Sequence, residues 1–227
     1  MIYVWISLFV LIWLFILYTK TAHYKGWSLE RKIDQILNRM ASKYGGIAYK
    51  DLLIPYNGAT SQIDNVLLTD KALYVIEAKN YNGYIYGSLT DQNWTLTQQN
   101  VKTYKNKRGK KYTKSFINKH AFYNPIKQNT IHINALKTLL KNPNALFINI
   151  VVFGQKTQLK NVNSDPQYPV IRLNQLKAFI NRNETKMSSS ISLQSMSQWV
   201  DSIVYANDPS RKARKNHIKQ LKKRYKA

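Results

Sequence analysis

The chain has no cysteine, and its 227 residues include only 11 Asp and Glu against 35 Lys and Arg. Without cysteine, disulfide frameworks and thiolate metal sites are excluded. The four histidines show no zinc-ligand spacing, so we expect surface or packing roles for His23, His120, His132 and His217. Two kinds of partner can absorb the formal net charge of +24: the phosphates of nucleic acid or an anionic membrane surface.

The first eighteen residues, MIYVWISLFVLIWLFILY, contain no charged side chain. As a helix, this run spans roughly 26 Å, near the lower limit for crossing a bilayer. A cleaved signal peptide is the alternative, but nothing basic precedes the run and TKTAHYKG is a poor cleavage site. Because Lys20 and Lys25 follow the run, the positive-inside rule places the rest of the chain in the cytoplasm. We expect a single-pass anchor in a bacterial cell membrane over residues 1–19, followed by a linker over residues 20–25.

A helix is predicted directly after this linker. GWSLERKIDQILNRM has apolar residues at helical spacing, and Ser28 is a candidate cap for its start. Glu30 falls on the edge of the apolar stripe, where the helix meets whatever it packs against. The alternative for Glu30 is a first-turn glutamate favoured by the helix dipole.

The middle of the chain alternates between strand and helix patterns. The continuous apolar run LFINIVVFG suits a strand buried on both faces of a sheet. Further strands are predicted from runs of strand-favouring residues. Further helices are predicted from a proline at the first helical position and from apolar residues at helical spacing. The other predicted strands are 51–56, 62–69, 73–79, 81–88 and 169–173, and the helices are 125–140, 174–182 and 190–205. We therefore expect one α/β domain over residues 26–205 and a basic tail over residues 206–227.

Three charged residues interrupt the most apolar strands of this domain. If Asp70 and Lys71 form the turn between the second and third strands, opposed residues have numbers that sum to 141. Asp64 then stands across from Glu77, with Cβ atoms about 5 Å apart. Lys79 projects from the same face as Glu77 because it lies two residues further along the strand.

Two buried carboxylates at that distance repel each other, and one is driven neutral unless a cation lies between them. Mg²⁺ relieves this repulsion by binding a few carboxylates and several waters. A neighbouring lysine can orient or deprotonate a metal-bound water, and the metal stabilises charge on an attacked phosphodiester. The alternative interpretation is a buried ion pair between Lys79 and one of the carboxylates, without chemistry.

Residues 92–164 contain 13 Lys and Arg and no Asp or Glu. The densest part, residues 102–119, is predicted to be a polar, mobile loop that either contacts nucleic acid or is simply solvated. The last seventeen residues carry nine basic side chains, for which DNA and anionic lipid are equally suitable partners. The candidate nucleic-acid-binding residues are Lys102, Lys105, Lys107, Arg108, Lys110, Lys111 and Lys114.

An ordered set of motifs lies within residues 26–155: QID at 62–64, IEAK at 76–79, YNGYIYG at 81–87, Trp94 and NPIKQN at 124–129. In combination, this set resembles the nuclease-related domain (NERD) family of the PD-(D/E)xK nuclease superfamily. The resemblance implies a restriction-endonuclease-like fold, in which a mixed central β-sheet is flanked by helices and carries a divalent-metal site. The long lysine-rich stretch between Trp94 and Asn124 departs from the family pattern, which is variable there.

Matching the motifs residue by residue implies a role for each candidate. Asp64 and Glu77 would be metal ligands, and Lys79 would be the catalytic lysine. Glu30 would be the acidic residue of the first helix, and Gln128 the polar residue of the helix after Asn124-Pro125. The leading hypothesis is a membrane-anchored DNA nuclease that depends on Mg²⁺ or Mn²⁺. The alternative is a membrane-tethered nucleic-acid-binding protein with little or no hydrolysis, although a pure binder has no need of paired buried carboxylates.

Overall fold

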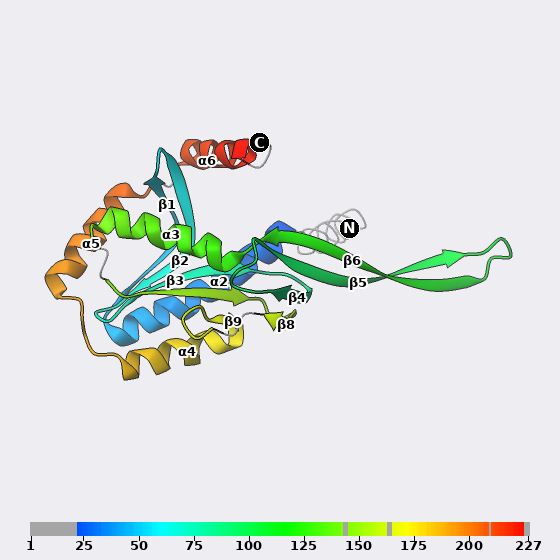
Figure 1. Ribbon diagram of the computed structural model, residues 1–227, viewed down its shortest axis with the longest axis horizontal. Coiled ribbons are helices and arrows are strands. Elements are labelled where there is room, and N and C mark those ends of the chain that lie inside the picture. Colours follow the sequence, from blue (N-terminus) through cyan, green and yellow to red (C-terminus); the bar gives the residue numbers. More distant parts are fainter. Residues whose placement is uncertain (1–21, 143–144, 163–164, 209, 225–227) are drawn as a thin grey trace, which may run out of the picture.

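The central element of the fold is a five-stranded mixed sheet. The structure is a computed structural model that describes residues 22–142, 145–162, 165–208 and 210–224. The first three strands are antiparallel, whereas β3, β7 and β9 run parallel, in the order β1-β2-β3-β7-β9 (Figure 1). The strands are β1 (Ile47–Tyr56), β2 (Ala59–Leu68), β3 (Leu73–Lys79), β7 (Phe147–Phe153) and β9 (Val170–Arg172). The strands predicted for these segments are confirmed, including the buried run that forms β7.

A second, four-stranded mixed sheet lies beside the first, which corrects the expectation of a single central sheet. Its order is β6-β5-β4-β8, and its strands are β4 (Gly83–Gly87), β5 (Asn93–Lys105), β6 (Lys111–Tyr123) and β8 (Thr157–Val162). Strand β4 cannot join β3, because both edges of β3 already pair with β2 and β7. It pairs instead with β5 and β8, and Gly87 allows Trp94 to lie against its backbone, since a Cβ there would be 2.3 Å from the indole ring.

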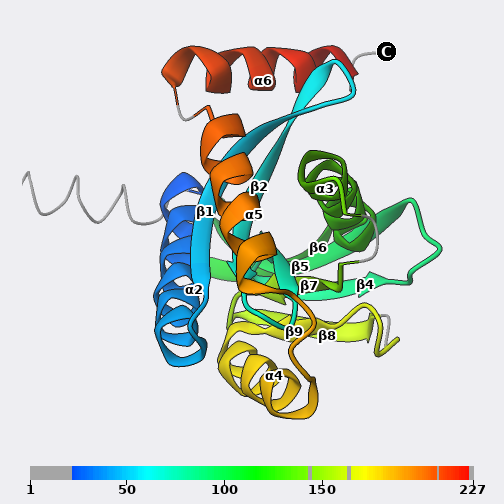
Figure 2. The ribbon, with the colours of Figure 1, turned by 90° about the vertical axis from the view of Figure 1, so that its left-hand side faces the viewer.

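Helices cover both faces of the central sheet. On one face lie α2 (Ala22–Tyr44) and α4 (Leu173–Lys186), which bury Leu37 and Leu176 against the sheet. The other face carries α3 (Pro125–Leu140) and α5 (Leu193–Ala206) (Figure 2). All three predicted helices after residue 120 are confirmed. The helix predicted near residue 28 is also present, but it begins earlier, so Ser28 lies inside α2 and is not its cap.

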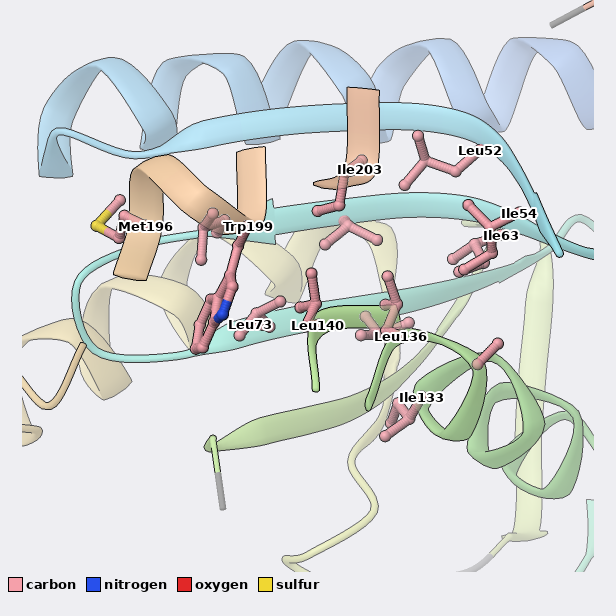
Figure 3. Packing of buried hydrophobic residues seen from close by; sticks show 14 of the residues in the cluster. Leu52, Ile54, Ile63, Leu73, Ile133, Leu136, Leu140, Met196, Trp199 and Ile203 are labelled. Atoms are coloured by element: carbon pink, nitrogen blue, oxygen red, sulfur yellow. The ribbon is translucent and has the colours of Figure 1, made fainter. Parts of the chain in front are cut away.

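The core beneath α3 and α5 fixes α3 on the sheet. Met196, Trp199 and Ile203 of α5 pack with Leu136 and Leu140 of α3 over apolar side chains of the first three strands (Figure 3). All five side chains are at most 7% exposed. Burial of each such side chain contributes roughly 1.5–3 kcal/mol, so this cluster holds the axis of α3 in place.

Buried amides determine how the first turns of α3 sit on the strands. Asn124 caps the helix by accepting a hydrogen bond from the Ile126 amide at 3.0 Å. Asn129 donates to the Val75 carbonyl oxygen and to the Asn149 side-chain oxygen, each at 2.8 Å. Because buried amides strongly favour satisfied hydrogen bonds, these contacts set the rotation of the helix. They thereby direct the neighbouring residues of α3 towards the ends of β2 and β3.

The lysine-rich segment forms a hairpin, so the prediction of a mobile loop over residues 102–119 is wrong. Strands β5 and β6 pair without interruption from Asn93↔Tyr123 to Lys105↔Lys111. At the turn, the Asn106 side-chain oxygen accepts from the amides of Arg108 and Lys110, and Gly109 adopts a φ of 76°. This turn chemistry, rather than burial, closes the hairpin.

The basic tail contains a helix, α6 (Arg211–Arg224), which packs on the β1–β2 hairpin. Arg214 Nη1 lies 2.5 Å from Asp51 Oδ1, and the buried His217 shares a 2.7 Å hydrogen bond with the Thr60 hydroxyl. The predicted tail is therefore attached to the domain along part of its length.

The predicted membrane anchor, residues 1–19, lies outside the described residues. None of the described helices combines the length and the apolar character needed to cross a membrane.

Candidate active site

The first candidate ligand lies where the pairing of β2 with β3 ends. The predicted register is confirmed by the pairs Leu68↔Leu73, Val66↔Val75 and Asn65↔Ile76, whose numbers sum to 141. The pairing ends at Asn65↔Ile76, so the next predicted pair, Asp64 opposite Glu77, is not part of the ladder. There the Asp64 carboxylate crosses to β3 and accepts a hydrogen bond from the Ala78 amide at 2.8 Å.

The second candidate ligand, Glu77, is buried in β3, with a side chain that is 2% exposed. Its Oε1 accepts a hydrogen bond from Lys79 Nζ at 2.6 Å, and Lys79 Nζ also donates to Gln128 Oε1 at 3.0 Å. Alternation along β3 places Glu77 and Lys79 on one face, and the first turns of α3 bring Gln128 over them. The structure therefore brings together four of the predicted residues: Asp64, Glu77, Lys79 and Gln128.

The sequence did not single out His132, which completes this cluster. It lies four residues after Gln128, on the same face of α3, and its Nε2 is 3.4 Å from Glu77 Oε2. Its Nδ1 shares a 2.7 Å hydrogen bond with the buried Ser61 hydroxyl. His132 is buried and hydrogen-bonded, as expected of a packing residue, and its spacing from Gln128 was the available signal for its contact with Glu77.

Electrostatics make the two carboxylates unequal. Burial raises the pKa of Asp64 well above its usual range, and the negative charge of Glu77 raises it further, against the opposing effects of the Ala78 amide and Lys79. Burial also acts to raise the pKa of Glu77, but Lys79 and His132 together lower it below its usual value. The pKa of Lys79 is raised because its attraction to Glu77 outweighs its own burial. In the absence of another cation, the site favours an ionised Glu77–Lys79 pair, beside which Asp64 holds its proton more strongly than an ordinary aspartate does.

Glu30 and the seven predicted nucleic-acid-binding residues lie away from the Glu77–Lys79 pair. Glu30 is exposed on α2, beside the buried Leu29, and its charge adds to the raised pKa of Asp64. It therefore acts on the site through the electrostatic field. The seven predicted nucleic-acid-binding cations are all exposed on β5, β6 and the turn between them, remote from the carboxylates (Figure 1).

A cavity of about 310 Å³ opens at the cluster. Its lining includes Asp64 from β2, Gln128 and His132 from α3, Tyr123 from the end of β6, and His217 from α6. The cavity is therefore bordered by the base of the lysine-rich hairpin and by the basic C-terminal helix. A phosphate group that enters this cavity meets polar side chains from four separate elements.

The donor set suits a hard divalent cation. Asp64 and Glu77 supply carboxylate oxygens, and within the described residues the polar neighbour of Glu77 Oε2 is His132 Nε2, at 3.4 Å. A cation would relieve the repulsion that raises the pKa of Asp64. Within the described part of the chain, no three His, Asp or Glu side chains are arranged to hold an ion. Two carboxylates would nevertheless be enough for an ion such as Mg²⁺, which typically keeps several waters and takes one or two carboxylates.

Comparisons with known proteins agree with this geometry. The model of the nuclease-related domain family matches residues 25–154, a span that contains the cluster and the whole lysine-rich hairpin. A protein of Bacillus anthracis, described as uncharacterized, is 26% identical over 203 residues, which cover 89% of this chain and 86% of that protein. No solved structure matches the chain significantly. The family match covers more than half of the chain, and the chain therefore belongs to the nuclease-related domain (NERD) family of the PD-(D/E)xK nuclease superfamily.

Proposed function

We propose that this protein is a membrane-anchored nuclease that uses Mg²⁺ or Mn²⁺ to hydrolyse phosphodiester bonds of DNA. One observation carries the proposal: Asp64, which lines a cavity, lies so near the buried Glu77 that the negative charge of Glu77 raises the pKa of Asp64 despite the neighbouring Lys79. Burying like charges side by side costs folding free energy, so the arrangement favours a cation-binding role. The restriction-endonuclease-like arrangement expected from the sequence agrees with a mixed sheet in which Asp64 of β2 lies beside the end of β3 that carries Glu77.

Each residue has a role in this proposal. Asp64 and Glu77 would hold the ion, which when bound supplies positive charge to the attacked phosphate and acidifies a water. The Lys79 ammonium group would orient the attacking water by donating a hydrogen bond, and Gln128 keeps that group directed into the site. Glu30 adds negative charge at the edge of the site, and the cations on β5 and β6 hold the phosphate backbone.

The membrane anchor is proposed from the sequence of residues 1–19, with the domain on the cytoplasmic side of a bacterial cell membrane. The basic C-terminal segment provides a second contact with either DNA or anionic lipid. This arrangement would concentrate nuclease activity at the inner surface of the membrane.

A second function is favoured by one contact. Lys79 is engaged by both Glu77 and Gln128, as expected of a structural ion pair inside a nucleic-acid-binding protein with little or no hydrolysis. The two functions share the same binding surface and differ in whether Asp64 and Glu77 would hold a metal ion.

A plasmid-cleavage assay distinguishes the nuclease function from the binding function. Full-length protein in detergent should nick or linearise plasmid with Mg²⁺ or Mn²⁺ and not with EDTA. Asp64→Asn, Glu77→Gln and Lys79→Ala should each abolish most of the cleavage, while Lys177→Gln on the exposed surface of α4 should not. Metal-independent binding with no cleavage by the wild-type protein would favour the binding function.

A further inference from the structure

The outer part of the lysine-rich hairpin is a free two-stranded ribbon, which we call the arm: residues 98–118. Strand β5 pairs with β4 only from Thr95 to Thr97, so within the sheet the arm is supported by its own pairing alone. The arm projects from the body of the protein (Figure 1). At about 3.4 Å per residue, its eight paired positions on each strand extend over roughly 27 Å.

Like charges face each other across the two strands of the arm. Lys105 pairs with Lys111, and Lys102 pairs with Lys114, so like charges lie directly opposite at two positions of the ladder. Such pairs destabilise a hairpin, and an isolated two-stranded ribbon is marginally stable in water. The sequence from residue 92 to residue 164 contains no acid that could offset them. A polyanionic partner supplies the missing counter-charge.

The aromatic residues of the arm contact its own side chains. Tyr104 and Tyr112 stack on each other with ring centroids 5.5 Å apart, and Lys102 lies 5.3 Å above the Phe116 ring. A platform for single-stranded nucleic acid instead presents open ring faces to successive bases. Mutual stacking leaves Tyr104 and Tyr112 with at most one free face each. The arm is therefore better suited to phosphates and groove walls than to unstacked bases.

We propose that the arm enters the major groove of duplex DNA. The major groove is about 12 Å wide and admits a two-stranded β-ribbon, whereas the minor groove is about half as wide. Lysines on both faces of the ribbon then reach the phosphates on both sides of the groove, and the cationic turn at residues 106–110 enters first. The proposal rests on the proposed function and names duplex DNA as its substrate.

The position of the arm also predicts where it contacts DNA. Tyr123 lines the cavity at the candidate active site, and Lys114 and Lys111 precede it by nine and twelve residues on β6. At about 3.4 Å per residue these lysines lie roughly 31–41 Å from the cavity. That distance is close to one turn of B-DNA, which is about 34–36 Å long. The protected groove should therefore lie about one turn from the cleaved bond.

Methylation by dimethyl sulfate tests the groove directly, because it modifies guanine N7 in the major groove and adenine N3 in the minor groove. Full-length protein without Mg²⁺ should protect guanine N7 in a duplex of about three turns and leave adenine N3 reactive. Lys105→Gln/Lys111→Gln should lose this protection and shallow the log–log salt dependence of binding by about 1.8, the effect of two phosphates. The matched variant Lys177→Gln/Lys186→Gln, with both exposed lysines on α4, should behave as wild type.

Other outcomes overturn the proposal. Protection of adenine N3 alone, protection unchanged in the arm variant, or equal affinity for the single strand would each contradict entry into the major groove. Arm-dependent binding to anionic vesicles, with unchanged DNA binding, would assign the arm to lipid. A protein that cleaves plasmid with Mg²⁺ but gives no guanine protection refutes only the arm proposal. A protein that neither binds nor cleaves DNA refutes the proposed function as well.

Discussion

The candidate active site and the arm handle charge in opposite ways. At the site, the charges of Glu77 and Lys79 lie largely out of solvent and change the pKa of each other and of Asp64. On the arm, seven cations are exposed to solvent. Interior charges are linked to the folding free energy, whereas solvated charges act mainly on binding partners. Substitutions in the two regions should therefore affect different measurements.

The largest effect on stability is expected from breaking the Glu77–Lys79 pair. Glu77→Gln leaves the Lys79 ammonium group buried without its counter-charge, and Lys79→Met leaves the Glu77 carboxylate in the same condition. Each should lower the free energy of unfolding by roughly 3–5 kcal/mol in chemical denaturation. The double variant should recover much of this loss, because it leaves no unpaired charge. Single variants as stable as wild type would show that the pair is solvated.

A smaller loss is expected from removing the histidine that sequence reasoning missed. His132→Leu leaves the buried Ser61 hydroxyl without its hydrogen bond and should cost about 1–3 kcal/mol in urea denaturation. Adding Ser61→Ala removes the second partner and should restore part of the lost stability. If the double variant is less stable than His132→Leu alone, the Ser61 hydroxyl is satisfied by another group.

The pH dependence of stability should identify Asp64. Its pKa is raised by folding, so the folded state binds more protons than the unfolded state between the ordinary carboxyl pKa and the raised value. Unfolding free energy from this group therefore falls as pH rises through that window. Metal-free Asp64→Asn should lose this decline and gain stability relative to wild type towards higher pH. Parallel pH profiles of the two proteins would contradict the raised pKa.

The smallest effect on stability is expected from deleting the arm. Replacing residues 99–117 by Asn-Gly joins the opposed pair Gln98↔Asn118 through a favoured two-residue turn. Because the arm buries little apolar surface, thermal stability should change by no more than about 0.5 kcal/mol. DNA affinity at low salt should nevertheless fall steeply. A large loss of stability would show that the arm packs on the domain.

Sequence patterns predicted the central sheet well because burial determines its strands. Strand β3 was predicted with its observed bounds, and the observed pairs of the β2–β3 ladder follow the predicted register. Both faces of these strands are buried, so a shift of one residue would move Val66 and Val75 from the core beneath α3 and α5 to the core beneath α2 and α4. The positions of Asp64, Glu77 and Lys79 follow from that register.

The parts that were missed depend on other forces. The arm and β8 are largely polar, so backbone pairing and turn chemistry define them and no apolar period marks them. His132 reaches Glu77 only through the rotation of α3, which the buried amides of Asn129 and Asn149 determine. The docking of α6 depends on His217 and Arg214, two residues among many basic neighbours. These contacts are tertiary, and a single sequence gives little warning of them.

The central claim is that Asp64 and Glu77 share a divalent cation, and thermal unfolding with and without Mg²⁺ tests it most directly. Binding to the folded state alone should stabilise the wild-type protein by about 2.7 kcal/mol when Mg²⁺ is present at 100 times its Kd. We predict a rise in Tm of several degrees for the wild type, and no rise for Asp64→Asn, which should melt at or above the metal-free wild-type Tm. A wild-type Tm indifferent to Mg²⁺, together with a strongly destabilised Asp64→Asn variant, would contradict the claim.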